Sequence, residues 1–323
     1  MYTTSITQHL THLQDELYNE MISSMKETDY SMPRPHGRYY YYSRTFEGEA
    51  YEVYCRAPRY TNSSYGGEDD SLTIDWDGTK ESPILPGEVV YLNVNELAVN
   101  QSQCDVNLVL TSPSHELVAY TVDYSGSEEY EVHVRNVTTG EDVVLKKSRE
   151  SSSNSDEPLK IDDLEWGKDD DTMYYTTLDE TNRPYQLYVR QNWKSQHDFT
   201  YCSRRRLIHC SRATSRNHST IGTCFMELGS KETTLPRFGY IDLSASSNAG
   251  EGGSIDMQCV APRRSNVLYY VESHDDQWYI TTNVGDSMNM KLMVSPATPD
   301  SADEWESVED ENGNPLFRYH SRD

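Results

Sequence analysis

The sequence has little positive charge and no long apolar run. Its 28 Lys and Arg residues are outnumbered by 53 Asp and Glu residues, which leaves a net charge of −25. Proteins bind nucleic acids and anionic membranes through Lys and Arg, so we expect no nucleic acid and no membrane among the partners. No segment approaches the roughly 18 consecutive apolar residues of a membrane-spanning helix.

Cysteine is scarce, and none of it is spaced as in a metal site. The six cysteines stand at positions 55, 104, 202, 210, 224 and 259. They form no C-x-x-C pair, and no His pair completes a zinc-binding spacing. We therefore predict free, mostly buried thiols, no metal and no cofactor. The first residues lack the basic start and apolar run of a secretion signal, so we expect a cytoplasmic location.

Catalytic motifs are also missing from the sequence. A serine hydrolase carries its nucleophile in a G-x-S-x-G turn between a strand and a helix. The nearest match, residues 252–256, ends in aspartate in place of glycine, so we reject Ser254 as a nucleophile. His274 precedes two aspartates in a predicted turn, and His209 and Cys210 are mere sequence neighbours. We predict no catalytic residue in this chain.

Two kinds of charge cluster need an interpretation. The acidic groups at 128–129, 162–163 and 169–171 lack the glycine and terminal glutamate of a calcium loop. We predict that they are turns and solvated faces. Residues 202–220 are locally basic, which suggests either a patch that binds anions or nucleic acid, or a strand pair with a basic loop or an insertion. We favour the second interpretation, because no aromatic residues alternate with the charges.

The N-terminal segment has the one helical pattern in the sequence. Its apolar residues recur every three or four positions, which predicts an amphipathic helix over residues 5–29. The Pro-containing segment 31–35 then ends it. The residues of the apolar stripe are Ile6, Leu10, Leu13, Leu17, Met21, Ile22 and Met25.

Short strand patterns follow the helix. Residues 106–111, 116–123, 130–137 and 141–145 alternate and are separated by turn residues, which predicts one antiparallel four-stranded meander. Similar patterns recur in 159–190 and 254–294, a repeat that is typical of propeller blades. A single β-sandwich is the alternative. In the meander we expect Leu108, Leu110, Val118, Tyr120, Val132 and Val134 on buried faces.

Several of these segments resemble a known family. The helix from LQDELYNEM onward, the Tyr-rich segment MPRPHGRYYYYSRTFEGEAYEVYCR, the stretch EVVYLNVNELA and the meander LVLTSPSHELVAYTVDYSGSEEYEVHVRNVTTGE carry the likeness. They are similar to the N-terminal propeller domain of the prolyl oligopeptidase family of serine peptidases, and most like its oligopeptidase B group. The resemblance covers 10–195 and 254–295, while 196–253 read as either genuine blades or an insertion.

The resemblance implies an all-β fold, a partial β-propeller of about four of seven four-stranded antiparallel blades. The propeller would occupy residues 36–323 after an N-terminal helix and linker, residues 1–35, and the catalytic α/β-hydrolase domain would be absent. In such peptidases the propeller admits only short peptides, cleavage follows basic residues or Pro, and the catalytic Ser, Asp and His lie in the other domain. The chain would then be a truncated, non-catalytic portion of a serine oligopeptidase.

Two other functions remain open from the sequence. The chain can be a stand-alone β-propeller-like binding module, or a regulatory subunit that complements a separate peptidase domain. Whether it is a truncated gene product or a real short protein is left open, as is any direct part in catalysis. Because an open propeller exposes a sheet at its edge, we also expect self-association through that edge.

Overall fold

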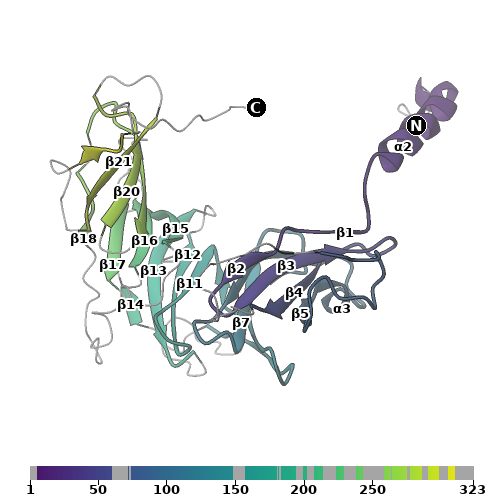
Figure 1. The fold of residues 1–323 in the computed structure, drawn as a ribbon, viewed down its shortest axis with the longest axis horizontal. Helices are drawn as coiled ribbons and strands as arrows, with labels where there is room; N and C mark the ends of the chain where they lie inside the picture. The colour runs from purple at the N-terminus through teal and green to yellow at the C-terminus, as the bar shows by residue number, and fades with distance from the viewer. Residues whose placement is uncertain are drawn as a thin grey trace. The chain divides into compact units, whose positions relative to one another are not determined.

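The computed structural model describes residues 6–59, 72, 74–147, 157–179, 181, 183–193, 199–201, 207–213, 223–228, 238–242, 258–262, 264–274, 277–285, 290–297 and 305–309 (Figure 1). The chain divides into two compact units, residues 1–101 and residues 102–323. No helix among the described residues is long and apolar enough to cross a membrane.

The first unit begins with the expected helix, which is shorter than the pattern predicted. It consists of η1 (Gln8–Leu10) and α2 (Thr11–Ser23). It ends at Ser23, although the apolar stripe continues to Met25, and the chain soon enters strand β1 (Asp29–Tyr30). No residue of α2 is buried, and the apolar side chain of Leu17 is 44% exposed. The stripe therefore has no covering partner among the described residues.

A five-stranded antiparallel sheet forms the rest of the first unit. Its strands are β1, β2 (Arg34–His36), β3 (Tyr39–Thr45), β4 (Val53–Pro58) and β5 (Val89–Asn93), in the order β1-β3-β4-β5 with β2 beside β3. Side chains of β3 alternate, so Tyr40, Tyr42 and Arg44 share the buried face. The short helix α3 (Val94–Leu97) follows β5. The side chain of Asn93 caps it by accepting the N–H of Asn95.

The second sheet confirms the predicted meander and opens the second unit. It contains β6 (Asp105–Thr111), β7 (Leu117–Asp123), β8 (Tyr130–Asn136), β9 (Asp142–Val144) and β10 (Lys160–Ile161), all antiparallel. Four of the six predicted buried residues are at most 1% exposed, while Leu108 and Leu110 are half-buried. Positions 118–123 of β7 are all buried, so both faces of this strand are covered. Both β9 and β10 pair with β8 and share its outer edge.

Three four-stranded sheets complete the described part of the second unit. The third sheet contains β11 (Asp163–Trp166), β12 (Thr172–Leu178), β13 (Pro184–Gln191) and β14 (Phe199–Tyr201). The fourth contains β15 (Leu207–Ala213), β16 (Thr223–Leu228), β17 (Phe238–Asp242) and β18 (Gln258–Cys259). The fifth contains β19 (Tyr269–His274), β20 (Gln277–Thr282), β21 (Lys291–Pro296) and β22 (Glu306–Ser307).

The described residues thus form five antiparallel sheets, which confirms the all-β fold class and is one more than the estimate of about four. The difference comes from residues 196–253, where β14, β15, β16 and β17 supply strands to the third and fourth sheets. The sequence leaves open whether this region forms blades or an insertion, and its described strands belong to the sheets.

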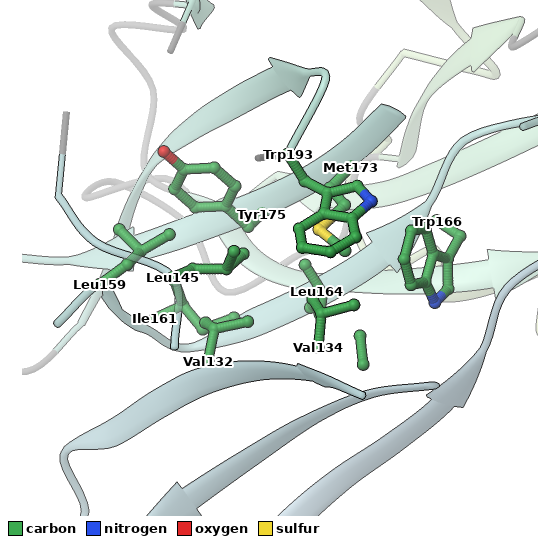
Figure 2. Close-up of a cluster of buried hydrophobic side chains, with 11 residues drawn as sticks. Val132, Val134, Leu145, Leu159, Ile161, Leu164, Trp166, Met173, Tyr175 and Trp193 are labelled. Carbon is green, nitrogen blue, oxygen red and sulfur yellow. The ribbon is translucent and has the colours of Figure 1, made fainter. Parts of the chain in front are cut away.

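An apolar cluster joins the second and third sheets. Figure 2 shows Val132 and Val134 from β8 facing Leu164 and Trp166 from β11. The buried members are Ala119, Val132, Val134, Leu145, Leu159, Ile161, Leu164, Trp166, Met173, Tyr175 and Trp193. Complete burial of one large apolar side chain contributes about 1.5–3 kcal/mol. The second and third sheets therefore bury apolar side chains against each other.

Candidate functional site

The structure describes the catalytic candidates of the sequence only in part. Ser254 and the two aspartates after His274 lie outside the described residues. His274 is the last residue of β19 and pairs across the hairpin with Gln277. His209 and Cys210 are consecutive residues of β15, and each pairs with a residue of β16. The absence of a catalytic residue in this chain stays a prediction.

The acidic groups have structural roles, with one correction to the prediction. Residues 128–129 are exposed in a turn as expected, and Asp169 accepts the backbone N–H groups of Asp171 and Thr172. Asp163, however, is buried in β11 and 7% exposed, so its prediction as a solvated residue is wrong. Its carboxylate accepts the N–H of Leu164 at 2.9 Å. In the part of the chain that the structure describes, no three His, Cys, Asp or Glu side chains could hold a metal ion.

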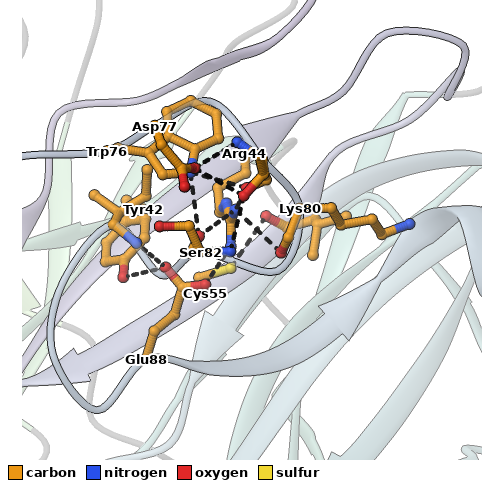
Figure 3. Close-up of polar contacts among 11 residues, drawn as sticks. Tyr42, Arg44, Cys55, Trp76, Asp77, Lys80, Ser82 and Glu88 are labelled. Atoms are coloured by element: carbon orange, nitrogen blue, oxygen red, sulfur yellow. Dashed lines mark hydrogen bonds and ion pairs between the residues drawn. The ribbon is translucent and has the colours of Figure 1, made fainter.

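A buried polar cluster surrounds Arg44 in the first sheet (Figure 3). The guanidinium pairs with the carboxylate of Glu88 and donates to the carbonyl oxygens of Thr79 and Ser82, both at 2.9 Å. The rings of Phe46 and Trp76 lie 4.8 and 5.1 Å from it. The charge is therefore paired and hydrogen-bonded, the condition under which burial of a charge is tolerated.

Glu88 connects this cluster to the interior of the sheet. It also accepts the hydroxyl of Tyr42 at 2.7 Å and the N–H of Ile84 at 2.9 Å. Burial and the nearby Glu88 outweigh the lowering effect of Arg44 and raise the pKa of the Cys55 thiol to about 12. A neutral thiol that is fully buried is inert. The cluster therefore fastens residues 76–88 to β3 and offers no nucleophile.

A second cluster contains three residue types common in active sites. The Tyr120 hydroxyl donates to the carboxylate of Asp142 at 2.5 Å. Nδ1 of His133 lies 3.3 Å from the Tyr120 hydroxyl oxygen and 3.3 Å from Oδ1 of Asp142. Burial and the hydrogen bond to Asp142 raise the pKa of Tyr120. Tyr120 and His133 are 0% and 9% exposed, so a substrate cannot reach them in this conformation. The cluster ties β9 to β7 and β8.

Sequence reasoning missed both clusters, although part of the signal was present. In the Tyr-rich strand, Arg44 stands two residues after Tyr42 and four after Tyr40, so alternation places a charge on an apolar face. Such a charge requires a buried partner. The sequence does not show which acidic residue supplies it, because Glu88 is 44 residues away.

The repeated antiparallel sheets define a β-propeller domain, and a known family fits the chain. The family described as "Prolyl oligopeptidase, N-terminal beta-propeller domain" matches residues 1–318. The chain therefore belongs to this family, as the resemblance of its segments indicated. It is 26% identical over 310 residues to dipeptidyl aminopeptidase BI of Pseudoxanthomonas mexicana. It is 24% identical over 295 residues to protease 2 of Moraxella lacunata.

These alignments cover most of this chain and a minor part of each relative. They span 94% and 91% of the chain, but only 38% and 37% of the two relatives. Oligopeptidase B from Leishmania major matches the structure with a TM-score of 0.67 and 26% identity, over 93% of this chain and 37% of that one. Oligopeptidase B from Trypanosoma brucei also matches with a TM-score of 0.67, at 22% identity, over 99% of this chain and 38% of that one.

Proposed function

We propose that the chain is the non-catalytic propeller portion of an oligopeptidase B-like serine peptidase and restricts that enzyme to short peptides. The observation that carries the proposal is the family match over residues 1–318. The relatives named as peptidases are more than twice as long as the part that this chain covers. In this proposal the catalytic Ser, Asp and His belong to a separate α/β-hydrolase domain, and residues 36–323 form the propeller after the N-terminal helix and linker.

The packing of the sheets gives a physical reason for size selection. The second and third sheets are joined by a buried apolar cluster, so they form a stiff wall. A stiff wall of this kind keeps a folded protein out of the active site, because the folded protein would have to unfold before it could pass. A short, extended peptide has no such barrier. The proposed substrates are therefore short peptides, with cleavage after basic residues or Pro.

The test is to isolate the native polypeptide from the source organism with antibodies raised against this chain. A fluorophosphonate probe, which labels activated serines, is then added. The proposal expects a labelled polypeptide longer than 323 residues. The purified 323-residue chain serves as the unlabelled control, and heat-treated native material shows that labelling requires a folded site. An unlabelled species near 37.2 kDa would overturn the proposal and favour a stand-alone binding or regulatory module.

We also propose that the isolated chain self-associates through the open edge of the propeller. The support is the start of β19, an edge strand of the fifth sheet, where Leu268 and Tyr270 are 39% and 49% exposed. Tyr270→Glu should shift the sedimentation of the purified chain toward the monomer, whereas Tyr18→Glu, on the exposed helix, should not. Equal sedimentation of wild type and Tyr270→Glu would contradict self-association through this edge. A cytoplasmic location stays a prediction, which a fluorescent fusion would test.

A further inference from the structure

The seam between the second and third sheets is bridged by polar contacts as well as by apolar packing. The indole N–H of Trp166 donates to the carbonyl oxygen of Leu110 at 3.0 Å. The guanidinium of Arg190 donates to the carbonyl oxygen of Lys146 at 2.8 Å. These two bonds run from strands of the third sheet to the backbone of the second. The seam therefore has directional contacts, which resist sliding of the two sheets past each other more than apolar packing does.

Asp170 makes a denser set of bonds across the same seam. It lies in the turn between β11 and β12, and its carboxylate accepts the hydroxyl of Ser112 at 3.1 Å and the backbone N–H of Ser114 at 3.0 Å. The Ser114 hydroxyl donates to the same carboxylate. One charged group in the third sheet thus accepts three hydrogen bonds from the turn between β6 and β7. Hydrogen bonds to a charged acceptor are the strong class.

The turn that carries Asp170 is itself held in place. The indole N–H of Trp193 donates to the carbonyl oxygen of Asp170 at 2.9 Å. The N–H of Gly167 donates to the carbonyl oxygen of Thr172 at 2.7 Å and closes the turn. Trp193 is also a buried member of the apolar cluster between the two sheets. The carboxylate is therefore presented to the serines by a rigid support.

We propose that Asp170 is a latch that joins the second and third sheets into one rigid pair. With the latch closed, the turn at residues 112–115 and the turn at residues 167–172 open together or not at all. If two neighbouring sheets of the second unit separate locally, they therefore do so at a place other than the seam between the second and third sheets. The latch does not depend on the proposed function, because it rests on contacts within the second unit.

Amide hydrogen exchange of the whole chain tests the latch. Asp170→Ala removes the acceptor of three hydrogen bonds, and each bond to a charged group is worth enough to change local opening about tenfold or more. We expect exchange to speed up by about that factor in residues 112–117 and 167–172 together. Exchange in the centres of β7 and β12 should keep its wild-type rate, because their ladder bonds are untouched.

Asp171→Ala is the matched control, since Asp171 is an exposed neighbour in the same turn. It should leave both segments at the wild-type rate. If Asp170→Ala does not fold, Asp170→Asn and Ser114→Ala, which keep part of the bond set, should show the same paired change with smaller size. Unchanged exchange in residues 112–117 would overturn the latch. So would an equal increase throughout the second unit, which would mean general destabilisation.

Discussion

Replacing Arg44 with alanine should destabilise the first unit strongly. The substitution leaves the carboxylate of Glu88 buried without its cation. It also removes one donor from the carbonyl oxygens of Thr79 and Ser82, which keep the indole N–H of Trp76. Breaking a buried ion pair by removing one partner costs about 3–5 kcal/mol. The lost contacts with the rings of Phe46 and Trp76 are worth about 1 kcal/mol each, but they overlap with this figure. We therefore expect a loss of about 4 kcal/mol.

A loss of this size is a large share of the roughly 5–15 kcal/mol that stabilises a typical domain. Urea unfolding, followed by tryptophan fluorescence, measures it, and Trp76 reports locally because its ring lies 5.1 Å from the guanidinium. The free energy of unfolding of Arg44→Lys should lie between those of wild type and Arg44→Ala. Lysine keeps the charge but cannot bond Glu88 and two carbonyl oxygens with one planar fork.

The matched control is Arg34→Ala, which removes an exposed arginine from β2 of the same sheet. Surface substitutions of this kind usually change the free energy of unfolding by about 0.5 kcal/mol or less. The reasoning is refuted if Arg44→Ala costs no more than Arg34→Ala, because the buried ion pair would then add nothing to stability.

Three further predictions concern single residues. Burial raises the pKa of Asp123, but hydrogen bonds from the Ser125 hydroxyl and nearby backbone N–H groups outweigh it and lower the pKa from 3.8 to about 2. The contribution of Asp123 to stability is therefore present above about pH 4 and lost toward pH 2. The urea midpoint of Asp123→Asn should fall less steeply than that of wild type between pH 5 and pH 3. An equal slope for the two proteins would contradict this. Gly167→Ala should cost about 1–3 kcal/mol, because its Cβ would lie 2.8 Å from Cβ of Thr172; an unchanged melting temperature would contradict the clash. Cys55 and Cys104, at 0% and 2% exposed with raised pKa values, should resist a thiol reagent at pH 8 until urea unfolds the chain; mass spectrometry locates any early label.

Local patterns allowed the prediction of the meander but not of everything that depends on distant partners. Strands β6, β7, β8 and β9 follow from alternation and turn residues within about 40 positions. The helix was predicted too long because its pattern continues to Met25, whereas Asp29 and Tyr30 pair with Thr45 and Arg44 of β3. Tertiary pairing therefore decided where the helical segment ends.

The polar clusters show the same limit. Arg44, Glu88 and Ser82 are dispersed along 45 positions, and only the folded sheet makes them neighbours. Asp170 and Ser114 meet across two sheets, so their acidic and serine-rich turns read as ordinary solvated loops in the sequence. The family was predicted better than any site, since the ordered series of segments indicated the family while no single motif indicated chemistry.

Size selectivity of the proposed full-length peptidase tests the central claim most directly. A short fluorogenic peptide with a basic residue at the cleavage position is compared with the same sequence placed in a surface loop of a folded protein. The quantity measured is kcat/KM, with trypsin as the control that must cleave both substrates. The account predicts rapid cleavage of the peptide and none of the loop. Comparable kcat/KM for the two substrates would contradict a propeller that restricts access.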